Sequence, residues 1–138
     1  MPQSLQDIED RLELLKMTLG LFAPEEPSPI ATELVQLGEE ILEHWILARG
    51  EVPASESEET LRLLALQAQS TALDPRFDAC RAACLELIDQ HTLVVAEPEH
   101  AATVERLLVA VAAAFHLYSC VTSRMAEAGL QEIARRQG

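Results

Sequence analysis

The sequence predicts an all-α protein, a helical bundle of about five helices whose long last helix forms the buried core spine. Apolar residues recur at spacings of three and four along nearly the whole chain, which is the period of one face of an α-helix. No stretch alternates apolar and polar residues for long enough to indicate a strand. Capping residues, prolines and glycines lie between the apolar segments, where they mark helix ends.

The first predicted helix covers about residues 4–21. Ser4 supplies an N-cap, and Asp7 follows at the third helical position. Six apolar residues continue at spacings of three and four, which places them on one narrow seam. These six residues are Leu5, Ile8, Leu12, Leu15, Leu19 and Phe22. The seam needs a cover, either within its own chain or on a second copy.

A proline-rich linker follows this helix, with three prolines from Ala23 to Pro29. Proline lacks a backbone donor and interrupts helical patterns. We therefore divide the chain into an N-terminal amphipathic helix with its linker, residues 1–27, and a helical bundle domain, residues 28–138. Because the linker uncouples the two parts, exchange of the first helix between subunits is physically easy, and we expect a homodimer.

The second and third predicted helices are bounded by cap signals. Ser28, followed directly by a proline, is typical of a helix start, and Gly50 is expected to end the second helix. Ser55 and Glu58 have the spacing of a capping box. They predict a third helix over about residues 56–70.

The fourth and fifth predicted helices lie on either side of Pro98. Asp74, followed directly by a proline, opens the fourth helix, which ends either near Gln90 or, in the longer alternative, near Val95. Pro98, between two glutamates, starts the fifth helix, which runs to about Ala128 before a glycine. Because the fifth helix is apolar nearly all round, we expect the second, third and fourth helices to cover it on every side.

The charge of the chain narrows its partners. There are 23 Asp and Glu against ten Lys and Arg, a formal net charge of -13. Such a field repels nucleic acid and anionic membrane surfaces, so we expect neither as a partner, whereas a basic protein partner is compatible. The uncharged run between Arg106 and Arg124 is slightly shorter than a typical membrane span. We interpret it as the buried helix of a soluble protein.

The cysteine content indicates the compartment. Three cysteines, an odd number, are too few for the disulfide framework of a secreted domain. The N-terminus has no basic segment followed by an apolar stretch, as a secretory signal would have. We therefore expect a reducing, cytoplasmic location.

The sharpest candidate site combines Cys80 and Cys84 on the fourth helix with His116 and Cys120 on the fifth. Each pair is four residues apart and so shares a helical face. Thiolates and imidazole suit zinc or another transition metal. The other interpretation is that the thiols fill the core, where small apolar cysteines are common. We favour this second interpretation and expect no cofactor.

The register of the two helices decides whether these residues can meet. In an antiparallel helix pair, the residue numbers of two facing residues add up to the same value all along the pair. This sum is about 189 if the fourth helix ends near Gln90 and about 194 if it ends near Val95. The smaller sum separates Cys80 from His116 by roughly 10 Å, and the larger brings them within roughly 3 Å of axial register. Cys84 faces Cys120 only at a sum of about 204, so one site with all four ligands is the least favoured arrangement.

Other chemistry is poorly represented. Cys80 and Cys84 lie on one unbroken helix, where their side chains do not point at each other, so they are a poor disulfide pair. Glu40 and His44 are interpreted as an exposed pair on the second helix. The sequence contains no glycine-rich phosphate loop, nucleophile elbow or dinucleotide-binding motif. An enzyme is therefore the less favoured class.

These features predict a small acidic cytosolic helical-bundle protein that acts by association, with itself or with a protein partner, and is not catalytic. Its interaction surface is expected to be the apolar seam of the first helix. The alternative is a metal or ligand sensor with a Cys/His site between the fourth and fifth helices. A third hypothesis is an enzyme with a cysteine nucleophile that His116 activates.

Overall fold

The computed structural model describes residues 2–55 and 59–132, and every regular element within these ranges is helical. The predicted all-α bundle is therefore confirmed. In chain order the elements are α1 (Leu5–Leu21), α2 (Pro27–Ala48), α3 (Glu59–Leu73), the short 3-10 helix η1 (Pro75–Cys80), α4 (Arg81–Ala96) and α5 (Thr103–Glu127).

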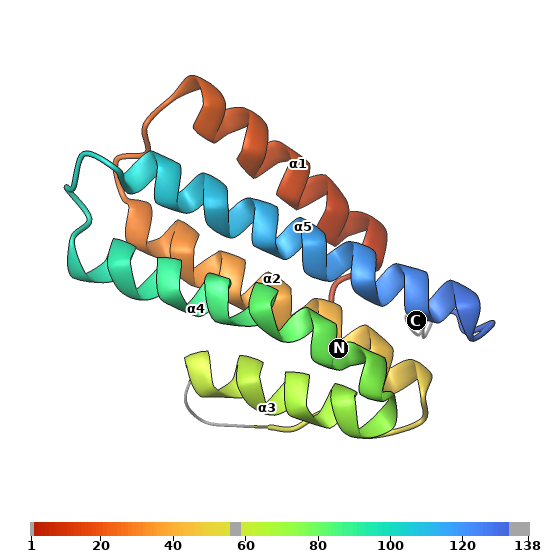
Figure 1. The fold of residues 1–138 in the computed structure, drawn as a ribbon. Coiled ribbons are helices and arrows are strands. Elements are labelled where there is room, and N and C mark those ends of the chain that lie inside the picture. The colour runs from red at the N-terminus through yellow and green to blue at the C-terminus, as the bar shows by residue number, and fades with distance from the viewer. Residues whose placement is uncertain (1, 56–58, 133–138) are drawn as a thin grey trace.

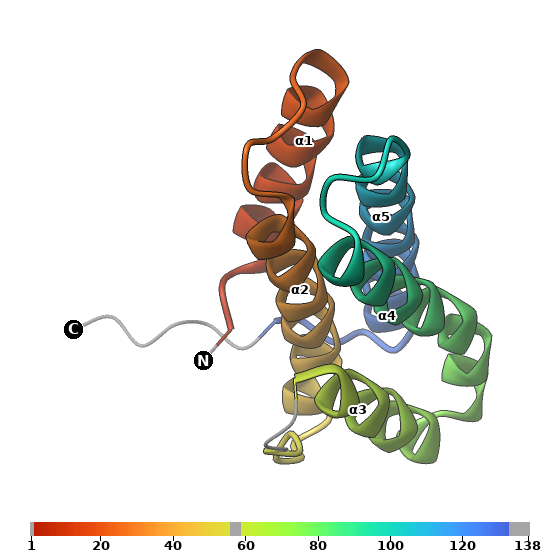
Figure 2. The same cartoon turned by 90° about the vertical axis from the view of Figure 1, so that its left-hand side faces the viewer.

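α2 lies at the centre of the bundle and contacts each of the other four α-helices, as Figure 2 shows. The long α5 packs against α2 and α4, as expected, and also against α1. In the part of the chain that the structure describes, α3 does not pack against α5, so the expected contact between the third and fifth helices is wrong. The reason is positional, because α3 lies at one end of the bundle, beneath α2 and α4 (Figure 1).

The side-chain caps predicted at Ser4 and Asp74 are both present. Ser4 Oγ accepts a hydrogen bond from the Asp7 amide at 3.0 Å, and Asp74 Oδ1 accepts one from the Arg76 amide at 3.0 Å. Asp74 opens the short η1 rather than an α-helix, and the chain then continues directly into α4. α4 extends to Ala96, which agrees with the longer of the two predicted alternatives.

The predicted start of α2 near Ser28 is confirmed to within one residue, because α2 begins at Pro27. Pro27 rather than Pro29 takes the first helical position, where a proline loses no hydrogen bond. The predicted start of the last helix is wrong. α5 begins at Thr103 rather than at Pro98. With α4 extended to Ala96, the residues that follow are needed to reverse the chain. Thr103 Oγ1 donates to the Pro98 carbonyl at 3.2 Å and stabilises this turn.

The C-terminal ends of α2 and α5 follow the glycine signals. Gly50 and Gly129 have φ of 79° and 69°, the left-handed conformation that ends a helix at glycine, and they lie just beyond α2 and α5. α3 ends at Leu73, directly before the Asp74 cap. Glu58 of the predicted capping box lies outside the described residues.

The apolar seam of α1 packs inside its own chain. Four of its six residues are buried in the core shared by all the helices, and Leu5 is partly buried against it. The four buried residues are Ile8, Leu12, Leu15 and Leu19. Phe22 is exposed, because α1 ends at Leu21 and the extended backbone of Phe22 leaves the helical path.

α5 has an open side, so the expectation that it is covered on every side is wrong. α1, α2 and α4 pack around it, but no described helix lies against the remaining face. The exposed residues of this face are Glu105, Val109, Ala112, His116, Ser119 and Ser123. By length and composition alone α5 could cross a membrane, a test that core helices of soluble proteins also pass.

Candidate functional site

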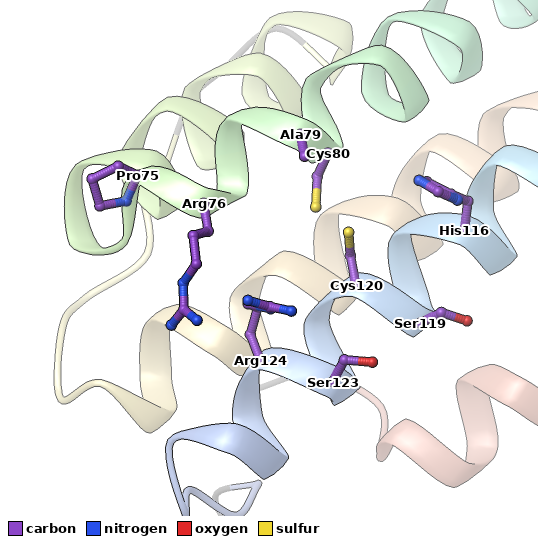
Figure 3. Close-up of a pocket in the computed structure, with 9 residues that line it drawn as sticks. All are labelled: Pro75, Arg76, Ala79, Cys80, His116, Ser119, Cys120, Ser123 and Arg124. Carbon is purple, nitrogen blue, oxygen red and sulfur yellow. The ribbon is translucent and has the colours of Figure 1, made fainter.

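A cleft of about 630 Å³ opens where η1 faces the C-terminal half of α5 (Figure 3). We call it the thiol cleft. Its walls combine thiol, guanidinium, imidazole and hydroxyl groups. The polar and sulfur-containing residues that line it include Arg76, Cys80, His116, Ser119, Cys120 and Arg124. Three of the predicted site residues, Cys80, His116 and Cys120, share this cavity.

The register of α4 and α5 explains why Cys80 faces Cys120. Because α4 ends at Ala96 and α5 begins at Thr103, facing residues have numbers that sum to about 199 rather than about 189 or 194. The chain reversal between the helices lies later in the sequence than in either predicted alternative. It therefore shifts the residue opposite Cys80 towards Cys120, and Figure 3 shows the two sulfur atoms pointing at each other.

The other two predicted ligands are placed differently. Cys84 lies one turn further along α4, fully buried, and does not line the cleft. His116 lines the cleft from the open side of α5, where it is exposed. Among residues 2–55 and 59–132, no group of three or more His, Cys, Asp or Glu side chains is placed to hold a metal ion. The structure thus brings Cys80 and Cys120 face to face and leaves Cys84 outside the cleft.

Burial controls the chemistry of the two inner thiols. It raises the pKa of Cys80, and a hydrogen bond with the Cys120 thiol raises it further. Burial, with a smaller contribution from the charge of Cys120, raises the pKa of Cys84 to about 12. Metal binding and nucleophilic attack both require the thiolate form. At neutral pH these two thiols are therefore mostly protonated in the free chain, so nucleophilic attack by either of them is slow.

The charged groups beside the thiol cleft neutralise one another. The Arg76 guanidinium contacts Asp74 Oδ2 at 2.8 Å and Glu127 Oε1 at 3.1 Å. Arg124 contacts the same Glu127 oxygen at 3.1 Å. Two guanidinium groups thus meet two carboxylates, and this cluster gives the cleft no excess positive charge with which to hold an anion.

A second apolar surface lies on the outer face of α1. Leu14, Met17 and Leu21 follow spacings of three and four and are 49, 62 and 69 % exposed. We call these three residues the outer stripe. The sequence analysis missed it because the longer inner seam dominates the same helix. The signal that could have revealed it is a second set of large apolar residues at helical spacing on the opposite side.

The apolar surface continues from the outer stripe onto α5. Two shallow hollows share Glu13 and Lys16; one also includes Met17 and Leu21, and the other lies between α1 and α5. The α5 side chains of the second hollow are Leu108, Val111, Ala112 and Phe115. Lys16 Nζ lies 5.9 Å from the ring centroid of Phe115. The Lys16 side chain therefore bridges the two helices across this surface.

Glu40 and His44 fasten the N-terminal segment to α2, so their interpretation as an exposed pair is wrong. His44 is only 2 % exposed, and its Nε2 contacts the Gln3 carbonyl. Glu40 Oε1 accepts a hydrogen bond from the Gln3 amide at 2.6 Å. Because a carbonyl can only accept, the His44 tautomer assigned by this contact carries its proton on Nε2.

The fold and these surfaces define a small all-α bundle with a thiol cleft on one side and an apolar surface on α1. No family model, no curated protein and no solved structure matches the chain.

Proposed function

We propose that this protein acts by association with a protein partner that presents an amphipathic helix with basic flanks, and that it is not itself a catalyst. The observation that supports this proposal is the outer stripe of α1. Its three large apolar side chains face solvent at positions i, i+3 and i+7, which is the anchor pattern by which helices dock against each other. Isolated apolar residues are common on surfaces, but a contiguous set favours an interaction surface.

Charge complementarity favours a basic partner. Asp7, Asp10 and Glu13 are exposed on the same helix as the outer stripe. The whole chain has a formal net charge of -13. Lysine or arginine on the flanks of a docked helix would meet these carboxylates, whereas a second copy of this acidic chain would be repelled.

The homodimer expected from the inner seam has a different requirement. Ile8, Leu12 and the other buried seam residues are already covered by their own chain. A dimer through this seam therefore requires α1 to leave one bundle and enter another, which is an exchange of arms rather than the docking of two free surfaces. The outer stripe is open without any such rearrangement.

A cytoplasmic location is part of the proposal. The chain has three free cysteines, of which Cys80 and Cys84 are buried and Cys120 is partly exposed. Free thiols are maintained in a reducing compartment.

The test uses a model peptide of about 18 residues, five helical turns long, with leucine on one face and lysine on its flanks. Binding is measured by fluorescence anisotropy against the intact protein. We expect Met17→Ser together with Leu21→Ser to weaken binding about tenfold or more. Val52→Ser is the matched control, because Val52 is an exposed apolar residue on the loop after α2.

Charge and self-association are tested separately. A second peptide with glutamate in place of lysine should bind much more weakly, and added salt should weaken binding of the lysine peptide. Equal binding of the two peptides, or unchanged binding by the stripe variant, would contradict the proposal. Light scattering adds a further check. A mass of twice 15.2 kDa that falls to the monomer value in the stripe variant would show that a second copy of the chain binds the outer stripe.

A further inference from the structure

The thiol cleft holds two thiols that face each other from different elements. Cys80 is the last residue of η1, and Cys120 lies on α5. Their sulfur atoms point towards one another (Figure 3), and both residues line the cleft. A disulfide requires side chains that converge in this way. Cys80 and Cys84, on one helical path, do not converge.

The two facing thiols differ in their access to solvent. Cys120 is partly exposed and lines the cleft, whereas Cys80 is only 1 % exposed. A small molecule that enters the cleft therefore reaches Cys120 first. Cys84 is fully buried and lies outside the cleft, so the chain contains its own control for thiol accessibility.

We propose that the thiol cleft is a redox-modification site, where a small-molecule disulfide such as glutathione disulfide converts the facing thiols of Cys80 and Cys120 into an intramolecular disulfide. This inference is independent of the proposed helix-docking function, because it concerns a different surface.

The reaction takes place in two exchange steps. Cys120 loses its proton, and its sulfur attacks one sulfur of the small disulfide. The sulfur–sulfur bond of the reagent breaks, and the released thiolate takes up a proton. Cys80 then loses its proton and attacks the Cys120 sulfur of the mixed disulfide, which releases the second small thiol. Overall, two cysteine thiols are oxidised and one small disulfide is reduced to two thiols.

The surroundings of the thiols determine the rates of the two exchange steps. The charge of Arg124, one turn beyond Cys120 on α5, acts against the burial that raises the pKa of Cys80. Burial remains the larger influence, so little Cys80 thiolate is present at neutral pH. The second exchange step is therefore expected to be the slow one, with a mixed disulfide on Cys120 as the species that accumulates first.

The product would link two parts of the bundle that already touch. η1 and α5 pack against each other, so the new bond requires no change of fold. It closes a loop that contains all of α4 and the connection to α5. A cross-link of this kind restricts the unfolded chain and stabilises the folded one.

The first experiment treats the reduced, full-length protein with glutathione disulfide under native conditions. Intact mass spectrometry should show one glutathione adduct and then the loss of two hydrogens relative to the reduced chain. Peptide mapping should identify a Cys80–Cys120 linkage. The same treatment in urea is the control, because the unfolded chain has no reason to prefer this pair. A native product with a Cys80–Cys84 or intermolecular linkage, or no internal disulfide at all, would overturn the proposal.

Single variants then assign the order of attack. Cys84→Ala should oxidise as the parent does. Cys80→Ala should stop at a stable glutathione adduct on Cys120, and Cys120→Ala should lose most of its reaction. Circular dichroism establishes that each variant is folded. The peptide map of the parent protein tests the Cys80–Cys120 linkage without any substitution. Abolition of the internal disulfide by Cys84→Ala in a folded protein would contradict the assignment.

Discussion

α2 and α5 are the two longest helices, and they differ in a way that composition does not explain. α2 carries four glutamates and a histidine, yet 12 of its 22 residues are buried. α5 contains the long uncharged run, yet only 9 of its 25 residues are buried. The difference follows from position in the bundle. α2 contacts all four other α-helices, whereas α5 contacts three of them and has an open side.

The centre of α2 is fitted closely to its neighbours. Gly38 of α2 faces α3, α4 and α5, and a Cβ atom there would be 3.0 Å from a methyl group of Leu87 and 3.4 Å from one of Leu63. A glycine at this point allows the close approach of α2 to α3 and α4. Polar residues on α2 are buried where they have a partner, as His44 does at the Gln3 carbonyl. Burial on α2 is therefore set by contacts rather than by hydrophobicity alone.

The largest expected effect on stability comes from a comparison of one β-branched residue on α2 with one on α5. Ile41 on α2 is fully buried, and Val109 on α5 is 41 % exposed. We expect Ile41→Ala to lower the free energy of unfolding by about 2–5 kcal/mol, because it leaves a cavity. Val109→Ala should change it by less than about 0.5 kcal/mol. Urea unfolding followed by circular dichroism measures both values. A comparable loss in the two variants would show that α5 is covered where the structure leaves it open.

A smaller effect on stability is expected when the histidine of α2 is compared with that of α5. His44 is buried against the Gln3 carbonyl, whereas His116 is exposed on the open side of α5. We expect His44→Ala to destabilise the protein by about 1–2 kcal/mol, because it leaves a polar group without its partner. His116→Ala should be close to neutral. Hydrogen exchange at the start of α1 should increase in the His44 variant alone. Unchanged exchange there would contradict the fastening role of His44.

The sequence allowed prediction of those parts of the fold that depend on local signals. Ser4 and Asp74 act through their own next few residues, and Gly50 and Gly129 act through their own φ, so each could be recognised from neighbouring residues. The exact first residues of α2 and α5 could not, because a proline is accepted at several positions around a helix start. The choice between them depends on where the neighbouring helices lie.

The candidate site was predictable in its residues but not in its pairing. Cys80 and Cys120 were both predicted as candidate ligands on neighbouring helices, but which residues face each other depends on where the chain reverses between α4 and α5. Each residue added to that connection shifts the register, and no local pattern fixes the start of α5 at Thr103. The open side of α5 could not be predicted from the sequence for a related reason. Valine and alanine at exposed positions have the same spacing as they would in a core.

The smallest expected effect on stability concerns two helix caps, the charged Asp74 and the neutral Ser4, which should respond differently to pH. Hydrogen bonds from the Arg76 side chain and backbone amide lower the pKa of Asp74 below its usual value. The folded state therefore favours the ionised carboxylate. Its contribution to stability is complete above the pKa of the unfolded chain, about 3.9, and is lost as the pH falls through the lower value of the folded protein.

We therefore expect Asp74→Ala to lower the free energy of unfolding by about 1 kcal/mol at neutral pH, and this loss should shrink as the pH falls below about 4. Ser4→Ala removes a cap that does not titrate, so its loss, also about 1 kcal/mol or less, should stay constant over the same range. Urea unfolding at a series of pH values measures both. A loss from Asp74→Ala that persists unchanged in acid would mean that its carboxylate acts only as a hydrogen-bond acceptor, without help from the Arg76 charge that ties η1 to the end of α5.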